Sequence, residues 1–169
     1  AKHRDTRPES LLSDGKWQSA SGQSVQYDGD VALVLDLGSE QELRKVHLMA
    51  YQRPSDFEAG RVTVSVGSDG QKWSQAGAIT NESVGQGTFE GEALVLSGAI
   101  SAKARYLKLE VRRGPEASRL LLGEVVVQGP AAGGPPAARP QPSTFTTPMQ
   151  VKRTLDQALI KAKVPFLFW

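Results

Sequence analysis

Cysteine is absent from this sequence of 169 residues, and histidine occurs only twice. Without cysteine the chain cannot form a disulfide, bind a metal through thiolates or use a cysteine nucleophile. His3 lies in a polar N-terminal stretch, and His47 is predicted to point outward from a strand. Since neither has a second histidine at the spacing of a metal site, we do not expect a zinc centre.

Several other signals of function are missing. No apolar run reaches the roughly 18 residues of a membrane helix, and a net charge of +2 is too small to indicate a nucleic-acid partner. No G-x-S-x-G elbow is present, and Asp28 and Asp30 lie in a predicted turn, where they are expected to shape the loop rather than transfer protons. The sequence does not determine the compartment. The absence of cysteine says little about it, since many exported bacterial proteins also lack cysteine, and an exported or periplasmic location is only slightly favoured.

Strand patterns dominate residues 31–128. Apolar and polar residues alternate most clearly over 61–67, and the Asp69-Gly70 pair that follows predicts a hairpin. Residues 31–37 are nearly all apolar, which predicts a strand covered on both faces. Strands spaced in this way without intervening helices favour a mainly β fold, an antiparallel sandwich or barrel. The other predicted strands are 43–51, 92–98, 105–112 and 120–129.

The composition changes abruptly at Gly129. Residues 129–142 contain five prolines and three glycines and no side chain that could build a core. Prolines favour an extended backbone, so we predict a Pro/Gly-rich linker over 130–143.

The residues after this linker combine a helix pattern with a strand pattern. Thr147 is a favourable N-cap, Pro148 takes the first helical position, and the following apolar residues form one stripe. The chain then ends in four large apolar residues, each worth about 1.5–3 kcal/mol if buried. A lone helix and strand cannot bury both surfaces, so we expect residues 144–169 to complete a domain of a partner polypeptide. The predicted interface consists of Val151, Leu155, Leu159, Phe166, Leu167, Phe168 and Trp169.

Five segments resemble, in the right order, the discoidin or coagulation-factor C-type family, which includes many bacterial carbohydrate-binding modules. The resemblance covers about residues 9–129 and implies an eight-stranded antiparallel jelly-roll sandwich, galactose-binding-like in fold. We therefore expect a discoidin-like β-sandwich over residues 1–129. The segments are LLSDGKW (11–17), VALVLDLGSEQELRKVHLMAYQRP (31–54), RVTVSVGSDGQKWSQ (61–75), ARYLKLEVRR (104–113) and LGEVVVQG (122–129).

The same resemblance implies a possible structural calcium ion. Many family members hold one where the early DG loop meets the late E-V strand, and the matching positions here are Asp14 and Glu124. Calcium prefers six to eight oxygen ligands. Lys16 and Trp17 stand where small oxygen-bearing residues are common, so Asp14 has the alternative role of a turn residue that caps its own backbone.

Ligands of this family usually bind to loops at one end of the sandwich. A sugar site needs an aromatic surface and planar hydrogen-bonding groups. Tyr51, Arg53, Asp56 and Phe57 in one predicted loop, and Tyr27 in another, are the candidates. The alternative is that Tyr51 and Phe57 pack at the edge of the core while Arg53 pairs with Asp56 or a neighbouring glutamate.

The segment TFTTPMQVKRTLDQALIKAKVPFLFW (144–169) resembles a stretch of FAD-dependent oxidoreductases with two dinucleotide-binding folds. In that family the helix leads into a strand beside the flavin-binding sheet. The phosphate-cradling G-x-G-x-x-G segment is absent here, and GQGTFEG (85–91) has the wrong spacing. The resemblance therefore implies FAD on an assembled complex, held by another polypeptide with the dinucleotide-binding fold. The alternative is that any capped amphipathic helix followed by a strand gives this pattern.

Two functional hypotheses follow. In the first, the chain is a β-sandwich subunit or fragment of a larger FAD-dependent oxidoreductase, a hetero-oligomer in which this chain is not catalytic alone. Its sandwich then binds carbohydrate or docks the assembly. In the second, the chain is a stand-alone carbohydrate-binding module with a truncated neighbouring domain. Neither hypothesis involves nucleic acid or a membrane.

Overall fold

Six antiparallel strands form the part of the chain that the structure describes. The computed structural model describes residues 3–5, 10–87 and 92–130, and within them no helix is long and apolar enough to cross a membrane. The strands belong to one compact unit that ends at Gly129. They are β1 (Val25–Tyr27), β2 (Val31–Tyr51), β3 (Ala59–Gly67), β4 (Ser74–Thr80), β5 (Leu94–Arg113) and β6 (Leu120–Gln128).

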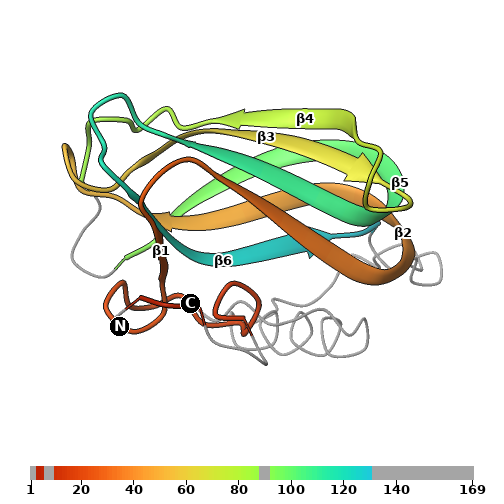
Figure 1. Cartoon of the computed structure of the whole chain (residues 1–169), viewed down its shortest axis with the longest axis horizontal. Coiled ribbons are helices and arrows are strands. Elements are labelled where there is room, and N and C mark those ends of the chain that lie inside the picture. The colour runs from red at the N-terminus through yellow and green to blue at the C-terminus, as the bar shows by residue number, and fades with distance from the viewer. Residues whose placement is uncertain (1–2, 6–9, 88–91, 131–169) are drawn as a thin grey trace, which may run out of the picture. The chain divides into compact units, whose positions relative to one another are not determined.

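Two long strands build the sandwich. β2 and β5 pair along nearly their whole length, and the register shifts between Asp36 and Gln41 and between Leu43 and Lys45. At these shifts the ribbon bends back, so each strand contributes to both layers (Figure 1). The hydrogen-bonded order is β1-β6-β2-β5-β3-β4. The second half of β2 pairs with β6, and the second half of β5 pairs with β3.

The core lies between the two layers. Alternate residues of each strand point inward, and leucine and valine fill the space. Val46 and Leu48 come from one layer and Leu107 and Leu109 from the other, and all four are fully buried. Burying each such side chain contributes about 1.5–3 kcal/mol, so the paired apolar faces hold the layers together.

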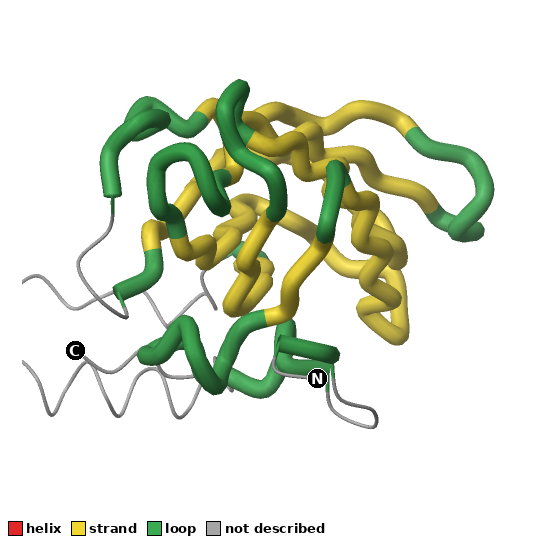
Figure 2. The backbone as a smooth tube through the Cα atoms, turned by 60° about the vertical axis from the view of Figure 1, so that its left-hand side comes forward, coloured by secondary structure: helices red, strands yellow, loops and turns green. Residues whose placement is uncertain are grey.

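The bend places both ends of the β2–β5 ribbon at one end of the sandwich, which we call the loop end. The loops 28–30, 52–58, 81–87 and 114–119 meet there, and Figure 2 turns this end toward the viewer. Backbone hydrogen bonds join them: Ser118 N–H donates to Asp56 O at 2.9 Å, and Gly114 N–H donates to Glu58 O at 2.9 Å. Residues far apart in sequence therefore share one surface.

The predicted strands are present, with two kinds of difference. The segments 31–37 and 43–51 form the single strand β2, and 92–98 and 105–112 form β5. β1 and β4 were not predicted. The hairpin at Asp69-Gly70 is confirmed, because it joins β3 to β4 and Gly70 has a φ of 71°.

The prediction that residues 31–37 are covered on both faces is wrong. Burial alternates along this segment, and Val34 is 57% exposed. This half of β2 pairs with β5 alone, so one face packs on the core while the other faces solvent. His47, predicted to point outward, is instead buried, and its Nδ1 lies 2.6 Å from Ser97 Oγ.

Candidate functional site

A strip of hydrogen-bonded polar side chains crosses the loop end. Arg119 lies at its centre: Nε and Nη2 donate to the two carboxylate oxygens of Asp56 at 2.8 and 3.0 Å, and Nη1 donates to Gln26 Oε1 at 3.0 Å. Gln26 Nε2 in turn donates to Asp28 at 2.7 Å, and Arg53 pairs with Asp56 at 3.4 Å. We call Gln26, Asp28, Arg53, Asp56 and Arg119 the loop-end strip.

The charges of this strip stabilise each other. The Arg119 guanidinium lowers the pKa of Asp56, and the Asp56 carboxylate raises the pKa of Arg119. A bidentate pair between a guanidinium and a carboxylate is planar and directional, so both groups keep a fixed orientation. The Arg53 side chain, at 69% exposure, leaves most of its donors facing solvent.

The aromatic candidates are positioned by packing. Phe57 is 8% exposed, and the guanidinium carbons of Arg53 and Arg119 lie 5.2 and 5.6 Å from its ring centre. Phe57 thus supports the two arginines through cation–π contacts. Tyr51 is 1% exposed, and its hydroxyl donates to the carbonyl of Trp17. These positions agree with the alternative interpretation, in which Tyr51 and Phe57 pack at the edge of the core. The pairing of Arg53 with Asp56 is also part of that interpretation.

A buried polar network supports the neighbouring loop. Asn81 Nδ2 donates to Gln52 Oε1 at 2.8 Å and to Ala59 O at 2.6 Å, while Asn81 Oδ1 accepts from Ser83 N–H at 2.9 Å. Glu58 is also buried and accepts from Gly85 N–H at 2.6 Å. Buried polar groups that are fully paired make a loop rigid, so this network fixes residues 81–87 at the loop end.

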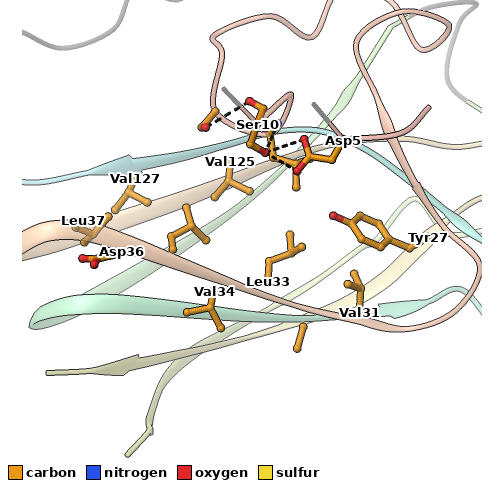
Figure 3. Close-up of a pocket in the computed structure, with 14 residues that line it drawn as sticks. Asp5, Ser10, Tyr27, Val31, Leu33, Val34, Asp36, Leu37, Val125 and Val127 are labelled. Atoms are coloured by element: carbon orange, nitrogen blue, oxygen red, sulfur yellow. Dashed lines mark hydrogen bonds between the residues drawn. The ribbon is translucent and has the colours of Figure 1, made fainter. Parts of the chain in front are cut away.

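Tyr27, the remaining candidate, lies in a different depression. A groove of about 1150 Å³ runs between the first half of β2 and β6, with Tyr27 toward one end and Leu37 toward the other (Figure 3). Its lining is mainly apolar. Its two carboxylates already have partners, since Asp5 accepts from Ser10 and Leu11, and Asp36 from Arg105.

Asp14 and Glu124, the predicted calcium ligands, accept hydrogen bonds from backbone N–H groups. Glu124 is 4% exposed and accepts from Gly15 N–H at 3.2 Å. Burial raises the pKa of Glu124 to about 7, against the opposing effect of the backbone donors of residues 14–16. Asp14 accepts from Lys16 N–H at 2.9 Å, which is the predicted backbone cap.

These contacts do not fit a calcium cage. Gly15 N–H donates to Glu124, and the Leu12 carbonyl already accepts from Val125 N–H at 2.8 Å. Within the described parts of the chain no cluster of three or more metal-binding side chains exists. Calcium needs six to eight oxygens, so carbonyl oxygens or water would have to complete the shell around the carboxylates of Asp14 and Glu124.

Sequence reasoning missed Arg119 and Gln26, the centre of the strip. Arg119 lies 63 residues from Asp56 in sequence, and no local pattern links them. The parallel bridge between Phe57 and Arg119 brings the two segments together. Only the strand pairing could have revealed the site.

Comparison with known proteins gives one family and one fold. Residues 2–125 match the model of the F5/8 type C domain. No curated protein sequence matches the chain.

Solved structures of similar fold include several carbohydrate-binding modules. A pectin-binding module is 17% identical with a TM-score of 0.50, covering 72% of this chain and 80% of that one. The CBM32 of AlyQ in complex with 4,5-unsaturated mannuronic acid is 20% identical with a TM-score of 0.52, covering 76% and 92%. A CBM32 of Clostridium perfringens in complex with GalNAc-β-1,3-galactose is 14% identical with a TM-score of 0.51, covering 75% and 91%. At these identities the likeness shows the fold.

Proposed function

This chain belongs to the F5/8 type C domain family, and from that membership we propose that its β-sandwich is a carbohydrate-binding module. The proposed site is the loop-end strip. The similar folds include modules whose structures hold a mannuronic acid derivative or a GalNAc-galactose disaccharide. These neighbours support the class of ligand, and the geometry of the strip supports the position of the site.

The observation that carries the proposal is the fixed orientation of the strip. Arg119 is held by three hydrogen bonds, to Asp56 and Gln26, before any ligand arrives. Neighbouring sugar hydroxyls both donate and accept, so they pair well with planar carboxylate, amide and guanidinium groups in fixed positions. Pre-organised side chains also lose little conformational entropy on binding.

A glycan array with matched variants tests this site. We expect the wild-type chain to bind one class of glycan and Arg53→Gln to weaken that binding by about fivefold or more, as for loss of an exposed charged contact. Arg44→Gln is the control, because Arg44 is also exposed and also pairs with a carboxylate, Glu42, at 3.2 Å. Failure to bind any glycan, or equal binding by both variants, contradicts the proposal.

The buried aromatic residues need a separate readout. Tyr51→Ala and Phe57→Ala would each remove a packed ring, and such changes cost about 3–5 kcal/mol in a core. Loss of binding in these variants would therefore report folding as much as recognition. Arg53→Gln avoids this because its side chain is exposed.

The finer proposal concerns residues 144–169, which lie outside the described residues, as do residues 131–143 of the predicted linker 130–143 and the interface from Val151 to Trp169. Their resemblance to FAD-dependent oxidoreductases supports a larger assembly in which another polypeptide holds FAD and the sandwich targets or docks the complex. Intact-mass analysis of co-purifying chains tests this. A partner with a G-x-G-x-x-G segment and flavin absorbance is expected, and a colourless single component contradicts it.

A further inference from the structure

Two arginines face each other on the outer side of one layer, close to the loop end. Arg61 on β3 and Arg112 on β5 are register partners, and both are exposed. The next pair in the register, Val62 and Val111, is fully buried, so the two arginines point to the opposite face. Directly opposite residues of antiparallel strands have Cβ atoms about 4.5–5.5 Å apart.

This pair has only a weak electrostatic partner among the described carboxylates: the pKa of Asp30 is lowered mainly by the Arg113 backbone N–H and, to a smaller degree, by the charge of Arg112. Within the described residues, neither Arg61 nor Arg112 forms an ion pair, whereas four other arginines on the sandwich, Arg53, Arg105, Arg113 and Arg119, each pair with an aspartate. The nearby acidic side chains are engaged elsewhere: Asp30 accepts from the backbone N–H of Arg113 at 3.0 Å, and Glu110 pairs with Lys108 at 3.5 Å. Like charges directly opposite each other destabilise a sheet, so this arrangement favours an anion between them.

The surface beside the arginines has room for a ligand. A depression of about 260 Å³ adjoins Arg112, and Ala32, Thr63 and the two partnered carboxylates Asp30 and Glu110 also line it, while Arg61 is not in its lining. Arg113, the next residue along β5, donates to the carbonyls of Ala117 and Ser118 at 3.3 and 3.0 Å, in the loop that leads to Arg119.

We infer that Arg61 and Arg112 form an anion site that binds a carboxylate or sulfate group of an acidic polysaccharide. Two guanidinium groups offer parallel N–H donors that match the oxygens of such a group. The inference rests on the proposed carbohydrate-binding function and adds the charge class of the ligand. The loop-end strip then contacts hydroxyls of the same chain.

Calorimetric titration with a matched pair of ligands tests the inference. Tetragalacturonate and its fully methyl-esterified form share one sugar backbone, and the ester replaces each carboxylate by an uncharged group. We expect the wild-type chain to prefer the acid form at low salt, and Arg61→Gln/Arg112→Gln to weaken its binding about five- to tenfold and to abolish the preference. Arg44→Gln, which removes one exposed arginine elsewhere, should retain the preference. Equal binding of the acid form by the wild type and the double variant overturns the inference.

A thermal-unfolding arm separates this site from the carbohydrate function. Millimolar sulfate should raise the Tm of the wild-type chain above its value in chloride of equal ionic strength. The double variant should lack this response and should start about 1–2 °C higher in low salt, because the repulsion is gone. If no glycan binds but the sulfate response needs both arginines, the anion site stands and the carbohydrate function fails. If glycan binding and the sulfate response are both unchanged in the double variant, the anion site fails alone.

Discussion

At the scale of single residues, Glu124 is the most perturbed acid among the described residues. Its carboxyl is buried, and burial raises its pKa to about 7 from an ordinary 4.5. Between these two values the unfolded chain ionises while the folded chain keeps its proton. The native state then binds more protons, so this group lowers stability as pH rises from about 4.5 to 7.

Replacement of Glu124 should therefore stabilise the protein at alkaline pH. We expect Glu124→Gln to gain about 1–3 kcal/mol relative to the wild type between pH 5 and pH 8, since the amide cannot ionise. Urea unfolding at both pH values measures this. Burial lowers the pKa of His47, so this residue makes the protein more stable as pH rises. Its contribution is the same in variant and wild type, and it cancels when the two are compared at one pH. Glu116→Gln, at an exposed position, is the control, and an equal gain there would contradict the account.

The position of Glu124 also leads to a prediction about calcium binding. Gly15 N–H already donates to one oxygen of Glu124, and no cluster of three or more metal-binding side chains exists among the described residues, so we expect no preformed cage for added calcium. We expect less than about 1 °C difference in Tm between millimolar calcium and excess EDTA, because a ligand stabilises only in proportion to its binding. A calcium-dependent rise of several degrees, lost in Asp14→Asn, would restore the metal site that the family resemblance implies.

At the scale of elements, sequence patterns predicted strands better than their connections. The alternation of 61–67 predicted β3, because Val62 and Val64 are buried while Arg61 and Thr63 are not. The prediction that the apolar run 31–37 is buried on both faces was wrong. Hydrophobic composition does not reveal that this half of β2 has only β5 beside it. Short β1 was not predicted, since three residues carry no period.

The loop end was only partly predictable for a related reason. Arg53, Asp56 and Phe57 belong to one segment, and sequence reasoning found them together. Arg119 and Gln26 reach them through strand pairing and a bridge between distant segments. The burial of Tyr51 also depends on a distant partner, the carbonyl of Trp17. Long-range contacts of this kind leave no local signal.

Asn81 tests how the loops are held in place. Asn81→Ala should remove three hydrogen bonds, two of them to buried groups of Gln52 and Ala59, which costs about 2–4 kcal/mol. Amide hydrogen exchange should accelerate first in residues 82–87. The adjacent and exposed Glu82→Ala is the control. If Asn81→Ala leaves both stability and exchange unchanged, the network does not anchor this loop.

At the scale of the whole molecule, the bent β2–β5 ribbon relates fold to function. It places both of its ends, and the loops attached to them, on one surface (Figure 1). The core between the layers holds that surface rigid, so polar side chains from three segments can form one pre-organised strip. An exported or periplasmic location, which the sequence favours, would suit a polysaccharide ligand.

The most direct test of the account is a chemical-shift map of the ¹⁵N-labelled chain during titration with the best glycan from the array. The account predicts perturbations at Gln26, Asp28, Arg53, Asp56 and Arg119, extending to Arg61 and Arg112 with an acidic glycan. Perturbations centred instead on the Asp69-Gly70 hairpin or on the groove between β2 and β6 would contradict it.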